Sequence, residues 1–427
     1  MVQRRAASLP PWAIPAFLLT LITLLAAFLS FYEIGKLSFW NDELSTVGFI
    51  NQSVFGTWKS IWPREMNMSL YYLIANLWMH LFTNPSEGTL RIISAAFFIA
   101  SIPAIFFLGK SYTSDEKAGT MIGLLAALFA SLNAFLIQYA QELRAYSLFT
   151  LLTVLSTLFL IKAVEKRVSR KLWIAYVLVS AAGFYTQYLF ALVILSQVIA
   201  LGVLFSRHIK LFPFVKLVRS FFILIILILP LVIAAHIVGK DNTDWIGKPT
   251  ILSIGKLVLA LTGNGGIILV LAYVACIGVG TFLRVHWQEK DGAKDWVTIL
   301  FLNALFLPLI LVLLLSTVGV QLFVNRYFIF CIPFLVILAA IGITKLFYKP
   351  LWGKTFAAIL LISIVTFSVV GLKSYFTNYQ KEDWRDLTGY LLLGCGSSND
   401  LRLYYPIWTT GLYFLLQPSG LYPKSCS

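Results

Sequence analysis

The stretch "MNMSLYYLIANLWMHLF", residues 66 to 82, is apolar enough to pass for a short membrane span. Four of its side chains are polar: Asn67, Ser69, Asn76 and His80. Its large apolar side chains recur at helical spacing, at Leu70, Leu73, Leu77, Trp78 and Leu81. This pattern predicts an amphipathic helix that lies in a membrane interface rather than one that crosses the bilayer. The topology of the whole chain depends on that choice.

The composition is that of a polytopic membrane protein. Of 427 residues, 59% are hydrophobic and 12% are charged, and the mean hydropathy is +0.85. Soluble globular domains carry about 25% charged residues, so a soluble domain is excluded. The first apolar run, residues 12–32, is long enough to cross a bilayer. No small-x-small cleavage pattern follows it, and we expect an uncleaved anchor rather than a signal peptide.

We expect an all-α protein with about eleven transmembrane helices. They are predicted near 12–32, 91–109, 118–138, 144–161, 172–187, 188–206, 220–238, 265–283, 296–316, 327–344 and 355–372. With the N-terminus inside, the inner loops hold 19 Lys or Arg and 6 acidic residues, and the outer segments hold 14 and 12. The net charge of +15 therefore follows the positive-inside rule and does not indicate nucleic-acid binding. If 66–82 crossed, "KAVEKRVSRK" (162–171) would lie outside, against that rule.

The expected organisation is a transmembrane domain, 1–372, and a short extracytoplasmic C-terminal segment, 373–427. The first outer loop, 33–90, contains the interfacial helix, and a second outer loop, 239–264, has room for a short surface helix. The tail begins with "NYQKEDWRDLTGYLLL", the pattern of an amphipathic helix, and "LRLYYPI" (401–407) has the pattern of a strand. This topology places the protein in the plasma or inner membrane, with a cytoplasmic N-terminus and an extracytoplasmic C-terminus.

Two outer segments carry acidic residues at the ends of apolar runs. "FWNDELSTVGF" (39–49) contains Asp42 and Glu43, and "QYAQELRAY" (138–146) contains Glu142. Such acids are often simply solvated, or they cap a helix. Here four arginines are predicted near the same face: Arg64, Arg91, Arg144 and Arg326. Guanidinium groups bind phosphate through a planar fork and a carboxylate can take a proton from a hydroxyl, so the face suits a phosphate-bearing lipid. Interfacial snorkelling of the arginines is the alternative.

The cysteines and histidines give weaker signals. Cys276 and Cys331 fall in predicted spans, where a buried thiol is expected, whereas Cys395 and Cys426 fall in the outer tail, where a disulfide is compatible with oxidation. Four scattered histidines do not predict a His-based metal site. Apart from Arg91 and Arg144, which are the first residues of their spans, the predicted spans contain no Lys, Arg, Asp or Glu, which argues against an ion-coupled transporter.

The chain resembles the GT-C superfamily of membrane glycosyltransferases, which use polyprenyl-phosphate-linked sugars. It is most similar to the branch of the protein O-mannosyltransferases and lipid A aminoarabinose transferases. The resemblance extends, in order, through "FWNDE", "REMNMSLYYLIANLWMHLF", "LRIIS", "IQYAQELRAYSL", "GFYTQYLFAL", "NRYFIFCIPFLVILAA" and "KEDWRDLTGYL". It implies a GT-C fold with interfacial helices after the first acid. It also implies transfer of a hexose or pentose from a polyprenyl-phosphate donor, with inversion, to a lipid, glycan or protein acceptor.

The resemblance also implies roles for the charged residues. Asp42 falls at the position of the general base or acceptor-orienting carboxylate, and Glu142 at that of the second acid. Arg326, with Arg144 as second candidate, is expected to hold the leaving phosphate. Glu43 is expected to hydrogen bond within the loop or to assist a divalent metal.

The sequence departs from the family pattern at two places. Many relatives have His-Pro-Pro where this chain has Asn67, Met68 and Ser69, and often His where it has Gln187. The sugar and any metal requirement therefore stay open. Five residues are candidates for a substrate pocket: Asn67, Tyr71, Tyr72, Tyr146 and Gln187. The tyrosines also fit an interfacial aromatic belt. A flippase or transporter of lipid-linked sugars and a non-catalytic membrane scaffold are the alternative functions.

Overall fold

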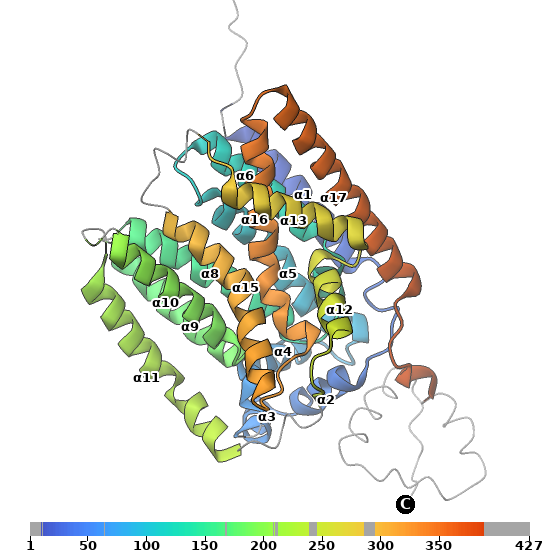
Figure 1. Ribbon diagram of the computed structural model, residues 1–427. Coiled ribbons are helices and arrows are strands. Elements are labelled where there is room, and N and C mark those ends of the chain that lie inside the picture. The colour runs from blue at the N-terminus through green and yellow to red at the C-terminus, as the bar shows by residue number, and fades with distance from the viewer. Residues whose placement is uncertain are drawn as a thin grey trace, which may run out of the picture.

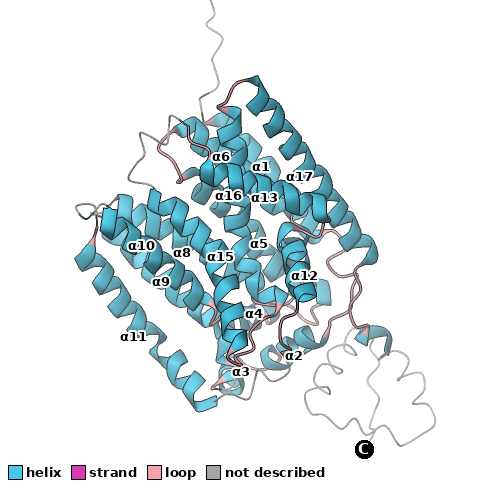
Figure 2. Cartoon of the chain, viewed as in Figure 1, coloured by secondary structure: helices cyan, strands magenta, loops and turns pink. Residues whose placement is uncertain are grey.

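The structure, a computed structural model, describes residues 10, 12–63, 65–166, 169–207, 209, 212–238, 246–285 and 295–387. Every regular element in these ranges is a helix (Figures 1 and 2). The first half contains α1 (Ala13–Phe31), α2 (Asn41–Ile50), α3 (Val54–Ile61), η1 (Met66–Met68), α4 (Ser69–Met79), α5 (Glu87–Lys110), α6 (Glu116–Ser131), α7 (Ala134–Ala140), α8 (Tyr146–Glu165) and α9 (Arg170–Thr186). The second contains α10 (Phe190–Arg207), α11 (Phe214–Val238), α12 (Ile251–Thr262), α13 (Ile267–Phe282), α15 (Asp295–Thr317), η4 (Asn325–Cys331), α16 (Ile332–Phe347) and α17 (Leu351–Asn378).

Each of the eleven predicted spans falls on one helix or on two consecutive helices, and the all-α prediction is confirmed for the described residues. Eight helices in this part of the chain are long and apolar enough to cross a membrane, and two bent helix pairs raise that number to ten. The helix at the remaining predicted span, α9, has 17 residues. The chain is therefore a multi-pass membrane protein, and the exact count of eleven crossings stays a prediction.

One predicted span is broken. The stretch 118–138 was expected to be continuous, but α6 ends at Ser131 and α7 starts at Ala134, with an angle of 63° between them. Asn133 causes the break locally, because its side-chain oxygen accepts a hydrogen bond from the Leu136 amide at 3.0 Å and so caps α7. Its amide nitrogen donates to the Leu261 carbonyl at 2.9 Å. That bond joins the break to α12, the short helix predicted in the second outer loop.

The centre of the molecule is α16. The span that it forms with η4 is 94% buried over its most apolar window, whereas the corresponding values for α1 and α11 are 11% and 17%. Helices α6, α13, α15 and α17 pack around α16 (Figure 1). Close approach of α13 and α16 requires small residues, as is usual between membrane helices. A Cβ atom added at Gly342 would lie 2.0 Å from the Cys276 carbonyl oxygen. Cys276 and Cys331 are buried free thiols, as expected.

The helix predicted at 66–82 is present as η1 and α4. Its leucine side faces outward, with Leu77 58% exposed, while Tyr71, Tyr72 and Asn76 are buried. The Asn76 amide donates to the carbonyl oxygens of Ile50 and Gln52, both at 2.7 Å. Because these acceptors end α2 and precede α3, the polar face of α4 holds the other outer-loop helices in place. The polar side of this amphipathic helix therefore positions α2, which carries Asp42 and Glu43.

After α17 the chain passes back to the first outer loop, and residues 384–387 form one helical turn. Arg385 binds Glu87, and Glu382 accepts a hydrogen bond from the Asn41 amide at 3.2 Å. The start of the predicted tail helix is thus attached to the N-terminal end of α2. Cys395, Cys426 and the predicted strand 401–407 lie outside the described residues.

Candidate active site

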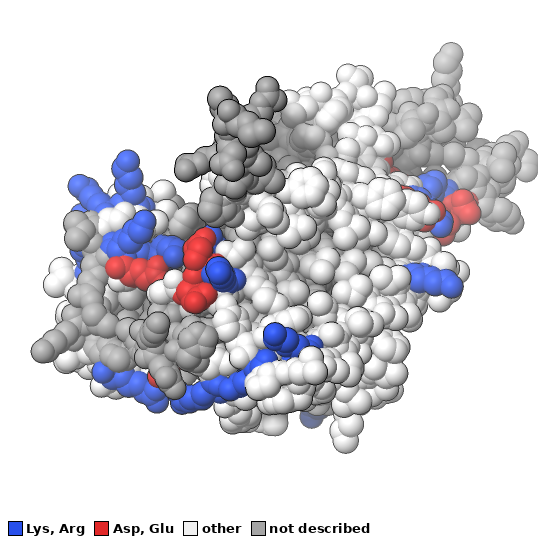
Figure 3. Space-filling model, turned by 90° about the horizontal axis from the view of Figure 1, so that it is seen from above, with Lys and Arg blue, Asp and Glu red and all other residues white. Residues whose placement is uncertain are grey.

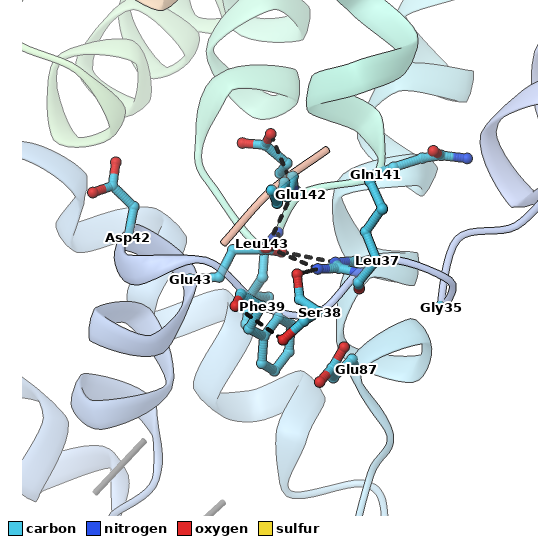
Figure 4. A network of polar contacts seen from close by, with 12 residues as sticks. Gly35, Leu37, Ser38, Phe39, Asp42, Glu43, Glu87, Gln141, Glu142 and Leu143 are labelled. Atoms are coloured by element: carbon cyan, nitrogen blue, oxygen red, sulfur yellow. Dashed lines mark hydrogen bonds and ion pairs between the residues drawn. The ribbon is translucent and has the colours of Figure 1, made fainter. Parts of the chain in front are cut away.

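Asp42 and Glu43, two adjacent acidic residues in the first turn of α2, lie in different surroundings. Consecutive residues of a helix point about 100° apart, and acidic side chains are favourable at a helix N-terminus. Figure 4 shows Asp42 directed away from the polar network that surrounds Glu43. The Asp42 side chain is 24% exposed and that of Glu43 is fully buried. The two residues therefore have different chemistry available to them.

Glu43 is held by three groups. Arg91 binds its two carboxylate oxygens in a two-pronged geometry, with both distances 2.8 Å. The Leu143 amide donates to Oε1 at 2.8 Å, and Lys381 Nζ lies 3.3 Å from Oε2. Burial alone would raise the pKa of Glu43, but the charges of Arg91 and Lys381 and these hydrogen bonds outweigh it and lower the pKa to about 2. Glu43 is therefore a permanently ionised anchor and a poor proton acceptor.

All hydrogen-bond donors of the Arg91 guanidinium are engaged in the same network as Glu43. Besides Glu43, its guanidinium donates to the carbonyl oxygens of Ile34, Leu37 and Ser38, at 3.0, 2.7 and 3.1 Å. These bonds engage all five of its donors, and its side chain is 1% exposed. The expected phosphate contact has no donor left on Arg91, so we assign this residue to holding the first loop on α5.

Glu142, directly after α7, is the second buried acid. Lys381 Nζ contacts its Oε1 at 3.1 Å, while Oε2 has no hydrogen-bond partner in the described part of the chain. Burial raises the pKa of Glu142 above its usual value against the opposing charge of Lys381, and nearby Glu43 raises it further. Its side chain is 1% exposed. Glu142 is therefore enclosed by protein and shares Lys381 with Glu43.

Lys381 is a site residue that sequence reasoning missed. It lies in the segment after α17, with a side chain 4% exposed, between two carboxylates that are 99 positions apart in the chain. Its signal was present in the motif "KEDWRDLTGYL", but only the fold shows that this motif returns to α2 and α7. A buried cation between two buried anions lowers the cost of keeping both there.

Asp42 belongs to a second, more open cluster. Its Oδ2 lies 3.3 Å from Arg326 and 3.7 Å from Arg144. Arg144 also donates to the Asp42 carbonyl oxygen at 3.1 Å and to Thr46 at 3.2 Å, which fixes the guanidinium against α2. The Arg326 guanidinium lies over the Trp40 ring, 5.4 Å from its centroid. The structure thus brings together the acid and the two arginines that the sequence predicted as base and phosphate ligands.

Another acid missed by the sequence analysis, Glu65, lies beside this cluster. Burial raises the pKa of Glu65, while Arg144 lowers it and Asp42 raises it, so its carboxyl interacts with both residues. Its signal was the "RE" that precedes 66–82. Arg64, predicted as a phosphate ligand, lies outside the described residues.

The predicted pocket residues separate into two groups. Tyr72 lies near Arg144 and Asp42, since both act electrostatically on its hydroxyl, and Tyr146 begins α8 two residues after that arginine. Tyr71 is fully buried and its hydroxyl contacts Ser94 at 2.7 Å, which indicates a packing role.

Asn67 and Gln187 lie elsewhere, near the junction of α9 and α10. The Asn67 side-chain oxygen accepts a hydrogen bond from the Tyr188 amide at 2.8 Å, and Gln187 ends α9. This group fastens η1 to α9. In the described part of the chain no group of three or more His, Cys, Asp or Glu residues has a geometry that could hold a metal ion, so the question of a divalent metal stays open.

Comparisons with known proteins concern the family and the fold. Residues 69–234 match the sequence model of the family "Dolichyl-phosphate-mannose-protein mannosyltransferase", which covers less than half of the chain. No curated protein matches the chain in sequence.

Two solved structures show the fold. ArnT from Cupriavidus metallidurans bound to undecaprenyl phosphate is similar over 96% of this chain and 85% of its own, with 12% identity and a TM-score of 0.59. The archaeal oligosaccharyltransferase AglB from Archaeoglobus fulgidus, in complex with an inhibitory peptide and a dolichol-phosphate, is similar over 97% of this chain and 60% of its own, with 10% identity and a TM-score of 0.59. The predicted resemblance to GT-C proteins is therefore confirmed for the fold.

Proposed function

We propose that this chain, which has the GT-C fold, is a membrane glycosyltransferase that moves a sugar from a polyprenyl-phosphate donor to an acceptor hydroxyl. The observation that carries the proposal is the pairing of a partly exposed carboxylate, Asp42, with two arginines, Arg144 and Arg326, at the membrane end of an apolar helix bundle. The family match over 69–234 supports it, because this stretch includes Arg144 and the helices around it. The relatives with bound undecaprenyl phosphate and dolichol-phosphate support the choice of donor.

The reaction follows from these positions. Asp42 accepts the proton of the acceptor hydroxyl as its oxygen bonds to the anomeric carbon. The bond from that carbon to the phosphate oxygen breaks on the opposite face, so the configuration inverts and the electron pair goes to the phosphate. Arg326 and Arg144 stabilise the charge that develops there. Without donor, Arg326 rests against Asp42, and the donor phosphate competes for the same guanidinium.

The buried cluster has a positioning role. Glu43, Arg91, Glu142 and Lys381 fix the start of α2 against α5, the end of α7 and the segment after α17. Asp42 is thereby presented from a rigid turn, as a base must be for efficient proton transfer. The transferred sugar is a hexose or a pentose in this proposal, and the acceptor is a lipid, glycan or protein hydroxyl.

The direct test is transfer of labelled sugar by reconstituted protein, with a panel of polyprenyl-phosphate hexoses and pentoses. Asp42→Asn keeps the shape and removes the base, so turnover is expected to fall by roughly 10²–10⁴-fold while donor binding is kept. Asp386→Asn, which changes an exposed acid in the segment after α17, is the matched control and should turn over normally. Near-normal turnover in a folded Asp42→Asn protein would remove the proposed base. Movement of intact donor across the membrane without transfer would indicate a flippase.

A further inference from the structure

A groove between α9 and α11 opens at the end of the molecule opposite to the candidate active site. It has a volume of about 430 Å³, within the range of roughly 300–1,000 Å³ typical of ligand pockets. Helix α9 starts at Arg170 on this side and ends at Thr186, next to the first outer loop. The groove therefore starts at the other membrane face.

Three cations lie at the mouth of the groove: Arg170, Lys216 and Arg219. Arg170 and Arg219 are exposed, and neither has an acidic partner among the described residues. Figure 3 looks onto this end of the molecule and shows Lys and Arg, with Asp and Glu among them, toward the left, where α11 lies in Figure 1. Basic pockets between membrane helices are suited to anionic lipid head groups.

Below the cations the lining is apolar. Ile174, Val177 and Leu178 of α9 face Ile223 and Leu227 of α11. From Lys216 to Leu227 the groove follows α11 for about 17 Å, at about 1.5 Å per residue. This depth is close to one leaflet, half of a hydrocarbon core of about 30 Å. At the level of Leu227 the helices are joined by a hydrogen bond of 3.0 Å from the Tyr185 hydroxyl to the Leu227 carbonyl.

Between the charged mouth and the apolar floor there is an unused donor. Trp173, one helical turn after Arg170, lines the groove and is 6% exposed, and its indole N–H has no acceptor in the part of the chain that the structure describes. An ester carbonyl of a glycerolipid lies just below the phosphate and would accept that hydrogen bond. Buried polar groups without a partner are uncommon in native proteins.

We propose that the α9–α11 groove binds an anionic phospholipid of the leaflet opposite to the active site. The phosphate sits among Arg170, Lys216 and Arg219, an ester carbonyl accepts from Trp173, and an acyl chain lies on Ile223 and Leu227. A bound lipid would fill the space beside α11, a helix whose most apolar window is only 17% buried by protein. The lipid is a structural ligand, so the proposal does not depend on the glycosyl-transfer reaction.

Native mass spectrometry of the detergent-purified full chain can test this with phosphatidylglycerol and phosphatidylcholine of identical acyl chains. Phosphatidylglycerol is expected to bind more tightly. At about 1 kcal/mol per cation, the triple variant Arg170→Gln, Lys216→Gln and Arg219→Gln should bind it on the order of 10²-fold more weakly. The exposed Arg219→Gln change alone should cost about fivefold and should not affect folding.

Two further variants separate a groove from a generally basic surface. The charge-matched control Lys117→Gln, Lys171→Gln and Lys354→Gln removes three cations from the same face outside the groove and should keep wild-type affinity. Ile223→Trp fills the apolar part without changing charge and should weaken binding. The proposal fails if phosphatidylglycerol binds no better than phosphatidylcholine, if the control triple loses as much affinity, or if Ile223→Trp binds normally.

Discussion

Asp42 and Glu43 divide the work of the site between two neighbouring carboxylates. Glu43 has a two-pronged arginine, a backbone amide and a lysine around it, so its charge is fully compensated. Among the described residues the Asp42 carboxylate has longer contacts, to Arg326 at 3.3 Å and to Arg144 at 3.7 Å, and its side chain is 24% exposed. A catalytic acid must be both held and reachable. The start of α2 meets both needs because it anchors Glu43 and leaves the neighbouring Asp42 available.

Replacing Glu43 by Gln should destabilise the protein by roughly 3–5 kcal/mol, because Arg91 and Lys381 then remain buried without their partner. The pKa of Glu43 is lowered in the folded state, from 4.5 to about 2. Its contribution is thus present above the unfolded value and is lost as pH falls from about 4.5 toward 2. The difference in apparent Tm between wild type and Glu43→Gln should therefore shrink between about pH 5 and about pH 3.

The control for that comparison is Glu116→Gln. Glu116 pairs with Lys110 at 2.6 Å, but its side chain is 78% exposed, and surface ion pairs contribute about 0–1 kcal/mol. A loss in Glu43→Gln no larger than in Glu116→Gln would mean that the buried network does not hold α2.

A second prediction at the residue scale concerns Arg326. Arg326→Ala should raise the KM for donor by roughly 10–10²-fold, the loss of one charge-assisted hydrogen bond. Arg326→Lys keeps the charge without the planar fork and should be intermediate. Steady-state kinetics against varied donor measure both. If Arg326 only snorkels, the Lys and Ala variants will differ little once expression is matched, and an unchanged KM in Arg326→Ala would move the phosphate site to Arg144.

The acids and arginines of the site were predictable from their residue types and positions at span ends. Their division of roles was not. Arg91 and Arg326 look alike in sequence, but the fold brings the carbonyl groups of Ile34, Leu37 and Ser38 to the guanidinium of Arg91. Lys381 was missed for the same reason, because its partners come from α2 and the end of α7.

At the scale of helices, the tightest contact is the crossing of α13 and α16. Gly342→Ala would place a Cβ atom 2.0 Å from the Cys276 carbonyl oxygen, and backbone cannot move aside cheaply. The cost of such overpacking is typically about 1–3 kcal/mol. The apparent Tm should fall accordingly in thermal unfolding of the purified protein.

Gly278→Ala on α13 is the matched control, since no atom lies within 4 Å of the added Cβ. It should be neutral or slightly stabilising, because Ala is favoured over Gly inside a helix by roughly 0.5–1 kcal/mol. Equal Tm values for the two variants would show that α13 and α16 do not approach this closely.

Helix positions were predictable because long apolar runs have few alternatives in a membrane. The bend between α6 and α7 was not predicted, although Asn133 could have signalled it, because an asparagine within an apolar run also fits an uninterrupted span. The bend depends on the hydrogen-bond partner of Asn133, the Leu261 carbonyl of α12, which lies 128 positions away in the chain. Periodicity indicated the helix at 66–82, and its polar residues, Asn67 and Asn76, proved to be its attachment points to α9 and to α2.

For the whole molecule, the two membrane faces carry different groups. The face with α2 and η4 holds the acid–arginine clusters. The other face holds the start of α9, where Lys and Arg outnumber acids in "KAVEKRVSRK" (162–171). The positive-inside rule predicts that this second face is cytoplasmic. The proposed chemistry then takes place outside, where a donor phosphate must be presented by a lipid because soluble nucleotide sugars are absent.

Cysteine accessibility tests this orientation. In a background without Cys395 and Cys426, a cysteine at Ser53, the residue before α3, should react with an impermeant thiol reagent in intact cells. A cysteine at Ser169, the residue before α9, should react only after the membrane is permeabilised. Cys276 and Cys331 are buried and serve as the unlabelled baseline. Outer labelling at both new positions would require 66–82 to cross the bilayer, and would therefore contradict the placement of α4 on the same side as Asp42. Labelling of Ser169→Cys alone in intact cells would indicate the opposite orientation in the membrane. The proposed site would then lie on the cytoplasmic side.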